Sequence, residues 1–214
     1  MLNFLIGLFT SASIAISGIP LNAIISIPTA PLTASLIETV VQAEPAVKTE
    51  NIPDVPFYSQ FQDIDSPKWQ KLGCGIASLA MLIEFYQPGS VSVDILLDEG
   101  IAAGAFINGA GWSHRGLASL AGQYGLKGTN YDFAKSDMDT AFTQLEKYLK
   151  DGPVIASVHY KLEPTNPIPH LVVVNGISGN TVYYNDPAAE SGGKRISVEN
   201  FLKAWKKRFI AVRL

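Results

Sequence analysis

Residues 72–82 of this chain have the sequence LGCGIASLAML, in which a turn gives way to an apolar helix. They include the only cysteine of the sequence, Cys74, which lies between Gly73 and Gly75. The free backbone N–H groups at a helix start carry partial positive charge, which favours a thiolate over a thiol. Flanking glycines would let a substrate backbone approach the sulfur, so we predict that both border a substrate site. Cys74 is a candidate nucleophile, although a free cysteine is often only a small buried hydrophobe.

A predicted β-hairpin near the C-terminus supplies partners for the thiol. Two runs rich in Val and Tyr flank the turn residues 177–180, with His170 before the first run and Asp186 after the second. Antiparallel pairing would bring both side chains to the open end of the hairpin. There the imidazole can accept the thiol proton, while the carboxylate orients the ring and stabilises its charge. Taken singly, each residue has another explanation: an unpartnered strand-edge histidine, and a turn former before Pro187.

The motifs around these residues resemble those of papain-like cysteine peptidases, in particular the stand-alone relatives of the double-glycine, bacteriocin-processing leader peptidases. The matching stretches are VPFYSQ at 55–60, CGIASLAM at 74–81, GPVI at 152–155, PHLVVV at 169–174 and YNDP at 184–187. Two positions depart from the commoner family pattern. Ile76 stands where proline or alanine is more usual, and Pro169 rather than glycine precedes His170.

The resemblance implies a papain-like α+β fold and a peptidase that acts through a thioester acyl-enzyme. In this family pattern Cys74 is the nucleophile, His170 the base and Asp186 the orienting acid. Gln60 would donate a hydrogen bond to the oxyanion beside the backbone N–H of Cys74, and Gln62 is the alternative donor.

Loops near the predicted site supply further candidates. Trp112 and Pro169, the latter ending a proline-containing segment that leads into His170, are predicted to contact substrate. His114 lacks a second metal ligand at helical spacing, and His159 is typical of a polar strand face. The basic residues in 203–208 could contact an anionic polymer, although such a short run is usually a solvated face.

The chain has 214 residues, 47% of them hydrophobic and 16% charged, which is enough for one well-buried domain. Its formal net charge of −3 gives no indication of a nucleic-acid surface. Glu38 is the only ionisable side chain in residues 1–43, so this segment is predicted to be a signal peptide or membrane anchor, which would allow membrane association. Residues 44–52 would be a spacer, and 53–214 the peptidase domain.

Local patterns predict helices first and antiparallel strands later, which is an α+β arrangement. The expected helices are 74–86, 93–103, 114–124, one from 136 or 137 to 150, and 198–205; the expected strands are 154–160, 171–177, 182–185 and 209–213.

We therefore expect an extracytoplasmic cysteine peptidase, secreted or membrane-anchored, that acts as a monomer on a peptide or protein substrate. No metal or organic cofactor is implied, because side chains and water complete the expected chemistry. The alternatives are a transglutaminase-like acyl transferase and a non-catalytic peptide-binding module on the same fold.

Overall fold

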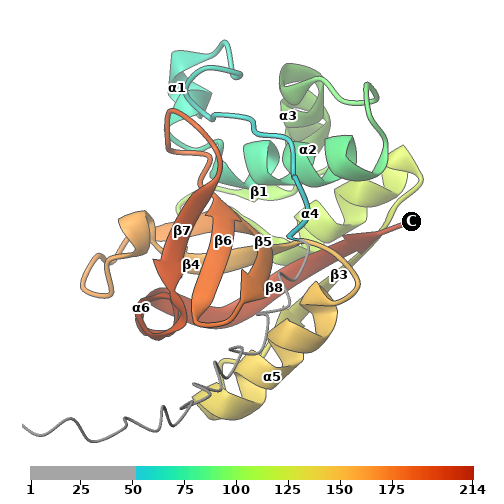
Figure 1. The fold of residues 1–214 in the computed structure, drawn as a ribbon. Helices are drawn as coiled ribbons and strands as arrows, with labels where there is room; N and C mark the ends of the chain where they lie inside the picture. Colours follow the sequence, from blue (N-terminus) through green and yellow to red (C-terminus); the bar gives the residue numbers. More distant parts are fainter. Residues whose placement is uncertain (1–51) are drawn as a thin grey trace, which may run out of the picture. The chain divides into compact units, whose positions relative to one another are not determined.

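The structure is a computed structural model that describes residues 52–214 (Figure 1). Its helices are α1 (Pro67–Gln70), α2 (Cys74–Tyr86), α3 (Val93–Ala102), α4 (His114–Leu120), α5 (Met138–Leu149) and α6 (Val198–Ala204), with 3-10 turns η1 (Ala121–Tyr124) and η2 (Tyr160–Leu162). Its strands are β1 (Phe106–Ile107), β2 (Gly111–Trp112), β3 (Lys127–Asp132), β4 (Val154–His159), β5 (Pro169–Ser178), β6 (Thr181–Asn185), β7 (Lys194–Ser197) and β8 (Trp205–Arg213).

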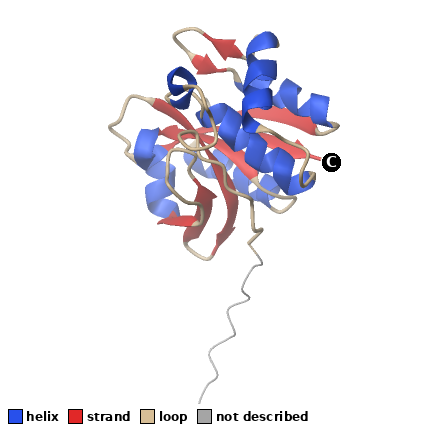
Figure 2. Cartoon of the chain, turned by 90° about the horizontal axis from the view of Figure 1, so that it is seen from above, coloured by secondary structure: helices blue, strands red, loops and turns tan. Residues whose placement is uncertain are grey.

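A six-stranded sheet forms the centre of this domain, with the strand order β3-β8-β4-β5-β6-β7. Every neighbouring pair in the sheet is antiparallel. Helices α2 and α4 pack on one face, whereas α5 and α6 pack on the other, so the sheet is the middle layer (Figures 1 and 2). Together these elements confirm the predicted α+β fold with the nucleophile helix packed on an antiparallel sheet.

The central strands are apolar on both faces because helices cover both. Ile155 and Val173 face the cluster built around α2, whereas their neighbours Ala156 and Val174 face the cluster around α5 and α6. Successive side chains of a strand point to opposite faces, so a continuous apolar run fills two cores at once. The central position of β4 and β5 holds the start of β5, with His170, in a rigid setting.

The predicted helix starts are confirmed by their caps. Ser113 accepts a hydrogen bond from the backbone N–H of Gly116 at 3.2 Å, and Ser92 accepts one from Ile95 at 3.5 Å. For α5 the cap is Asp137, which accepts from Thr140 at 2.7 Å. Each cap satisfies a backbone N–H that has no partner within its helix.

The prediction of a secreted or membrane-anchored protein requires correction. Among residues 52–214, no helix has the length and apolar character needed to cross a membrane. The segment on which the prediction was based, 1–43, lies outside the described residues, as does most of the predicted spacer. The expectation of an anchored or extracytoplasmic protein is therefore withdrawn.

Candidate active site

Cys74 is the first residue of α2 and lies partly exposed at the edge of the domain. The cap residue Gly73 provides no side-chain hydrogen bond to the first backbone N–H groups of the helix. One turn further along the helix, the hydroxyl of Ser78 donates to the backbone carbonyl of Leu171 at 3.3 Å. This bond fixes the start of α2 beside the residue that follows His170.

His170 and Asp186 meet at the open end of the β5–β6 hairpin, as its antiparallel arrangement predicts. Nε2 of His170 lies 2.6 Å from Oδ1 of Asp186, and both side chains are largely shielded from solvent. The same carboxylate oxygen accepts a hydrogen bond from the backbone N–H of Ala188 at 2.9 Å. Because Nε2 is engaged by the carboxylate, Nδ1 is the ring nitrogen that remains available to another partner.

The electrostatics of this group favour a charged imidazole. Burial alone would lower the pKa of His170, but hydrogen bonds and charge interactions with Asp186 and Cys74 outweigh it and raise the pKa to about 9. Burial would likewise raise the pKa of Asp186, yet the hydrogen bond and charge of His170 bring it below its ordinary value. A histidine of this kind stays protonated at neutral pH while a carboxylate balances its charge.

The strap of residues 55–60 explains why the VPFYSQ run accompanies the hairpin. The buried side chain of Asn185 donates to the carbonyl of Val55 at 2.9 Å, and the backbone N–H of Gln60 donates to the carbonyl of Pro187 at 2.8 Å. These bonds fasten the strap to both sides of Asp186. The run is therefore structural as well as a source of the glutamine.

Gln60 is buried beside the residue that precedes Cys74. Its Cβ lies 3.4 Å from the position that a Cβ on Gly73 would occupy. Its Nε2 donates to the carbonyl of Gln70 at 2.7 Å, which fixes which end of the amide is nitrogen. An amide nitrogen carries two N–H bonds, and this contact uses one of them. Gln62, the alternative donor, is exposed to solvent.

The glycines on either side of Cys74 are required by packing inside the protein. A Cβ on Gly73 would collide with the side chain of Ile64, and a Cβ on Gly75 would lie 2.7 Å from Cγ of Trp112. Both glycines are buried, and their contact with a substrate stays a prediction. Gly75 instead allows the indole of Trp112 to lie against the helix start, where its Nε1 donates to the carbonyl of Leu72 at 2.6 Å.

A cleft of about 470 Å³ opens beside the sulfur. Cys74 and His170 line it, together with the predicted substrate-contact residues Trp112 and Pro169. Phe106 forms an edge-on contact with Trp112, with ring centroids 5.2 Å apart, so one part of the lining is aromatic. Gln60 and Asp186 are not among the residues that line this cleft.

The positions of two residues beside the site were not predicted from the sequence. The ring of Tyr160 packs edge-on against the imidazole of His170, with centroids 5.1 Å apart, and so restricts its orientation. His114 lines the cleft, where burial and the nearby Arg208 lower its pKa although Asp132 acts in the opposite direction. No local motif indicates either role, because each depends on contacts between distant segments.

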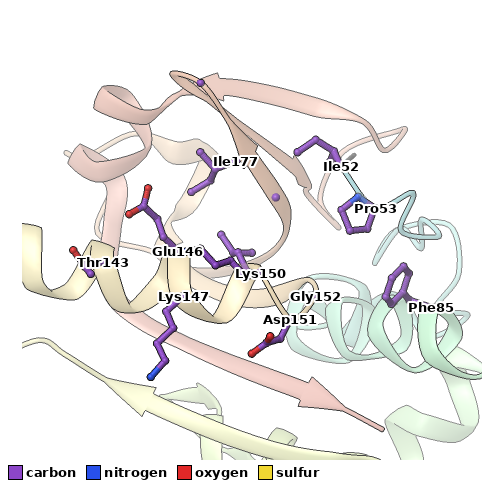
Figure 3. Close-up of a pocket in the computed structure, with 13 residues that line it drawn as sticks. Ile52, Pro53, Phe85, Thr143, Glu146, Lys147, Lys150, Asp151, Gly152 and Ile177 are labelled. Atoms are coloured by element: carbon purple, nitrogen blue, oxygen red, sulfur yellow. The ribbon is translucent and has the colours of Figure 1, made fainter. Parts of the chain in front are cut away.

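A larger cavity, of about 980 Å³, lies away from these groups (Figure 3). It is bounded by α5, the β5–β6 turn and the segment that begins at Ile52 and Pro53. Its charged lining residues, which include Glu146 and Lys150, are exposed, and Cys74, His170 and Asp186 do not contribute to it. The smaller cleft is therefore the candidate active site.

Comparisons with known proteins agree with this assignment. The model of the Peptidase_C39 like family matches residues 52–209. A structure described as a C39-like peptidase from Bacillus anthracis is similar, with TM-score 0.57, 21% identity, and coverage of 75% of this chain and 94% of the other. A double glycine motif protease from an AMS/PCAT transporter, in complex with its leader peptide, gives TM-score 0.52, 24% identity and coverage of 77% and 95%.

The peptidase domain of Streptococcus ComA, a bi-functional ABC transporter, gives TM-score 0.52, 23% identity and coverage of 67% and 92%. A search of curated protein sequences finds no match. The similar structures share the fold at low sequence identity, so the fold is what they establish.

Proposed function

The chain belongs to the Peptidase_C39 like family, and from this premise we propose that it hydrolyses peptide bonds with Cys74 as the nucleophile. The resemblance seen in the motifs is confirmed at the level of the family, whose members are cysteine peptidases. The finer assignment, with His170 as acid and base, Asp186 as its orienting partner and Gln60 as oxyanion donor, is our proposal. A single chain supplies all of these groups, so we expect a monomer to be sufficient.

Acylation begins from a Cys74 thiolate paired with the His170 imidazolium. The sulfur attacks the carbonyl carbon of the peptide bond, and negative charge develops on the carbonyl oxygen. The N–H groups of Cys74 and of the Gln60 amide stabilise that charge. As the C–N bond breaks, His170 gives its proton to the leaving amine, which leaves a thioester and a neutral imidazole.

Deacylation uses the same groups in reverse. Neutral His170 takes a proton from water as the water oxygen attacks the thioester carbonyl carbon. The C–S bond then breaks, the carboxylic acid product leaves, and the thiolate–imidazolium pair is restored. Asp186 stabilises the imidazolium at the start and the end of the cycle, and it remains ionised throughout.

The observation that carries the proposal is the 2.6 Å contact between His170 and Asp186, with Cys74 interacting with the same ring. Alkylation by iodoacetamide tests it without knowledge of the substrate, because the chain has one cysteine. We expect rapid alkylation at pH 6 in the wild type. In His170→Gln we expect a rate about 100-fold lower at that pH, because the variant lacks the imidazolium that stabilises the thiolate.

An alkylation rate at pH 6 that is the same in the wild type and in His170→Gln would contradict the ion-pair mechanism. It would favour the peptide-binding module over an enzyme. The matched control is His159→Gln, whose ring Nδ1 lies 2.6 Å from the carbonyl of Asn166 in a neighbouring loop, and whose alkylation profile should follow the wild type.

The oxyanion assignment gives a separate prediction. Gln60→Ala should lower kcat by about 10² to 10³ with little change in KM, because the lost donor acts chiefly in the transition state. Gln62→Ala is the matched control, and its kinetics should equal those of the wild type. Thermal unfolding of both variants reports any structural effect of losing the bond to Gln70. Equal kcat values for wild type and Gln60→Ala, or a large loss in Gln62→Ala, would contradict the assignment.

A further inference from the structure

Strand β8 departs from regular pairing next to the active-site cleft. Ala156 pairs with Phe209 and Val158 pairs with Trp205, so Ser157 alone stands opposite residues 206–208. Such a bulge inserts extra residues into one strand and redirects their side chains, commonly beside active sites. Ser157 itself lines the cleft, so the inserted residues lie at its wall.

The bulge is held in a strained shape by contacts from the neighbouring segment. Lys207 has φ 56°, a left-handed backbone that side-chain-bearing residues rarely adopt. Its carbonyl accepts from the backbone N–H of Phe133 at 2.9 Å, and its Nζ donates to the carbonyl of Ser136 at 2.6 Å. Strain of this kind persists where surrounding contacts impose it, and it concentrates at functional sites. Lys207 thus shapes the bulge, while its neighbours face the cleft.

The consequence is a positively charged wall. Lys206 and Arg208 both line the cleft that contains Cys74 and His170, with Lys71 also among its lining residues. No Asp or Glu of residues 52–214 lines this cleft. The formal net charge of the chain is −3, so the excess of cations at this place does not follow from composition.

The charges of the wall are only partly compensated. Nε of Arg208 lies 2.9 Å from Oδ2 of Asp132, in a pair that remains substantially exposed. Lys206 makes no ion pair with a carboxylate in the described part of the chain. Burial and the charge of Arg208 lower the pKa of Lys206, as expected for cations held near each other. An anion placed between the two would relieve this repulsion.

The remaining lysines of the basic run have other roles. Lys203 is exposed and forms an ion pair at 2.6 Å with Glu199 on the same helix. Nζ of Lys207 donates a hydrogen bond to the backbone carbonyl of Ser136. The basic run therefore divides into residues that stabilise the fold and a pair, Lys206 and Arg208, that faces the cleft. That division is not visible in the sequence.

We propose that Lys206 and Arg208 bind a carboxylate of the substrate, so that the cleft selects acidic peptide segments next to the bond that Cys74 attacks. This inference rests on the proposed function, because it names the substrate class of the same site. Arginine and lysine recognise carboxylates by charge-assisted hydrogen bonds, which are strengthened where a cleft excludes water. A cleft of one charge sign also raises the local concentration of an oppositely charged substrate.

Two alkylating reagents test the wall directly. Iodoacetate and iodoacetamide alkylate the thiolate by the same reaction, in which the sulfur displaces iodide as the S–C bond forms. Only iodoacetate carries a negative charge. We expect the ratio of their rates at Cys74 to fall by about tenfold in the double variant Lys206→Gln, Arg208→Gln. High salt should reduce the wild-type ratio as well.

The matched control removes two positive charges elsewhere. Lys147→Gln with Lys150→Gln, exposed residues in the last turn of α5 and at its C-cap, makes the same change in net charge and should leave the ratio unchanged. Circular dichroism and thermal unfolding verify that each double variant is folded. A ratio that stays the same in the Lys206→Gln, Arg208→Gln protein, or that falls equally in both double variants, would overturn the proposal.

The carboxylate could belong to an acidic side chain or to the C-terminus of a peptide, and a second arm distinguishes them. Unstructured peptide mixtures with free or amidated C-termini are digested, and mass spectrometry identifies the bonds cut. Preference for Asp or Glu near the cut in both mixtures assigns the side chain, whereas cutting only near free C-termini assigns the terminus. Either preference must weaken in the Lys206→Gln, Arg208→Gln protein, and an undiminished preference overturns the proposal.

Failure of the proposed function is separable from failure of this inference. If the wild type cuts no peptide, the proposed peptidase activity fails. In that case the ratio of alkylation rates still shows whether Lys206 and Arg208 act on an anion in the cleft. In a protein that does cut peptides, an unchanged ratio would refute carboxylate binding by these two residues and leave the peptidase activity standing.

Discussion

Replacing Cys74 with alanine is expected to abolish peptide hydrolysis while leaving the domain folded. The thiolate is the only proposed group that forms a bond to the substrate, so its loss removes the acyl-enzyme pathway. Loss of the nucleophile in a triad enzyme lowers kcat by about 10⁶, and we expect a fall to the detection limit of a peptide digest followed by mass spectrometry. The sequence has no other cysteine that could substitute.

The same variant should remain cooperatively folded. Cys74 is partly exposed at the first position of α2, where alanine is well tolerated and leaves no buried cavity. Cys74→Ser provides the conservative comparison, since it keeps the size of the group but replaces a thiolate with a weak alcohol nucleophile. Full turnover by the alanine variant would eliminate Cys74 as nucleophile, whereas a variant that fails to fold would be recognised by circular dichroism.

The parts of the site that lie close together in the sequence could be predicted from it. The hairpin signal depends on a local turn between two apolar runs, and the resulting β5–β6 pair brings His170 and Asp186 within hydrogen-bond distance. The start of α2 at Cys74 follows likewise from an apolar helical pattern after a glycine. Their catalytic roles remain predictions.

Elements whose stability comes from distant contacts were missed. Strand β3 has the sequence KGTNYD, and Asn, Asp and Gly are disfavoured in strands. It forms because β8 supplies a partner at the sheet edge, and because Gly128 lets the backbone of Ala118 approach where a Cβ would collide. The four-residue helix α1 is too short to produce a periodic pattern.

The start of β8 shows the same limit at a functional position. The sequence predicts a strand from Phe209, whereas the strand begins at Trp205. The added residues are mostly basic, and their strand geometry depends on β4 and on contacts from Phe133 and Ser136. The pattern of residues 203–208 alone favours a solvated face. Which of these cations face the cleft is settled only by the bulge.

Asp186→Asn should preserve the fold but lower kcat by about 10³ to 10⁴. The asparagine amide can donate to Nε2 and so hold the imidazole in the wrong tautomer, and it provides no negative charge to stabilise the imidazolium. The wild-type pKa of about 9 at His170 depends on Asp186 and Cys74 together, so the variant should lose its imidazolium at lower pH. The alkaline limb of the kcat profile should therefore move to lower pH.

The control for this variant is Glu199→Gln, which removes the carboxylate of an exposed pair with Lys203 and should leave kcat unchanged. An Asp186→Asn enzyme with wild-type kcat and an unmoved alkaline limb would return Asp186 to the role of a turn residue before Pro187.

Thermal unfolding tests the ion pair between His170 and Asp186 without a substrate. The pKa of His170 is raised in the folded protein to about 9, so its charge contributes stability that is fully present below the unfolded value, about 6.5, and is lost as pH rises through about 9. Asp186→Asn removes most of that contribution. The difference in Tm between wild type and variant should therefore be large at pH 6 and should shrink as pH approaches 9.5. A difference that stays constant over this range would mean that His170 and Asp186 do not form an ion pair in the folded protein.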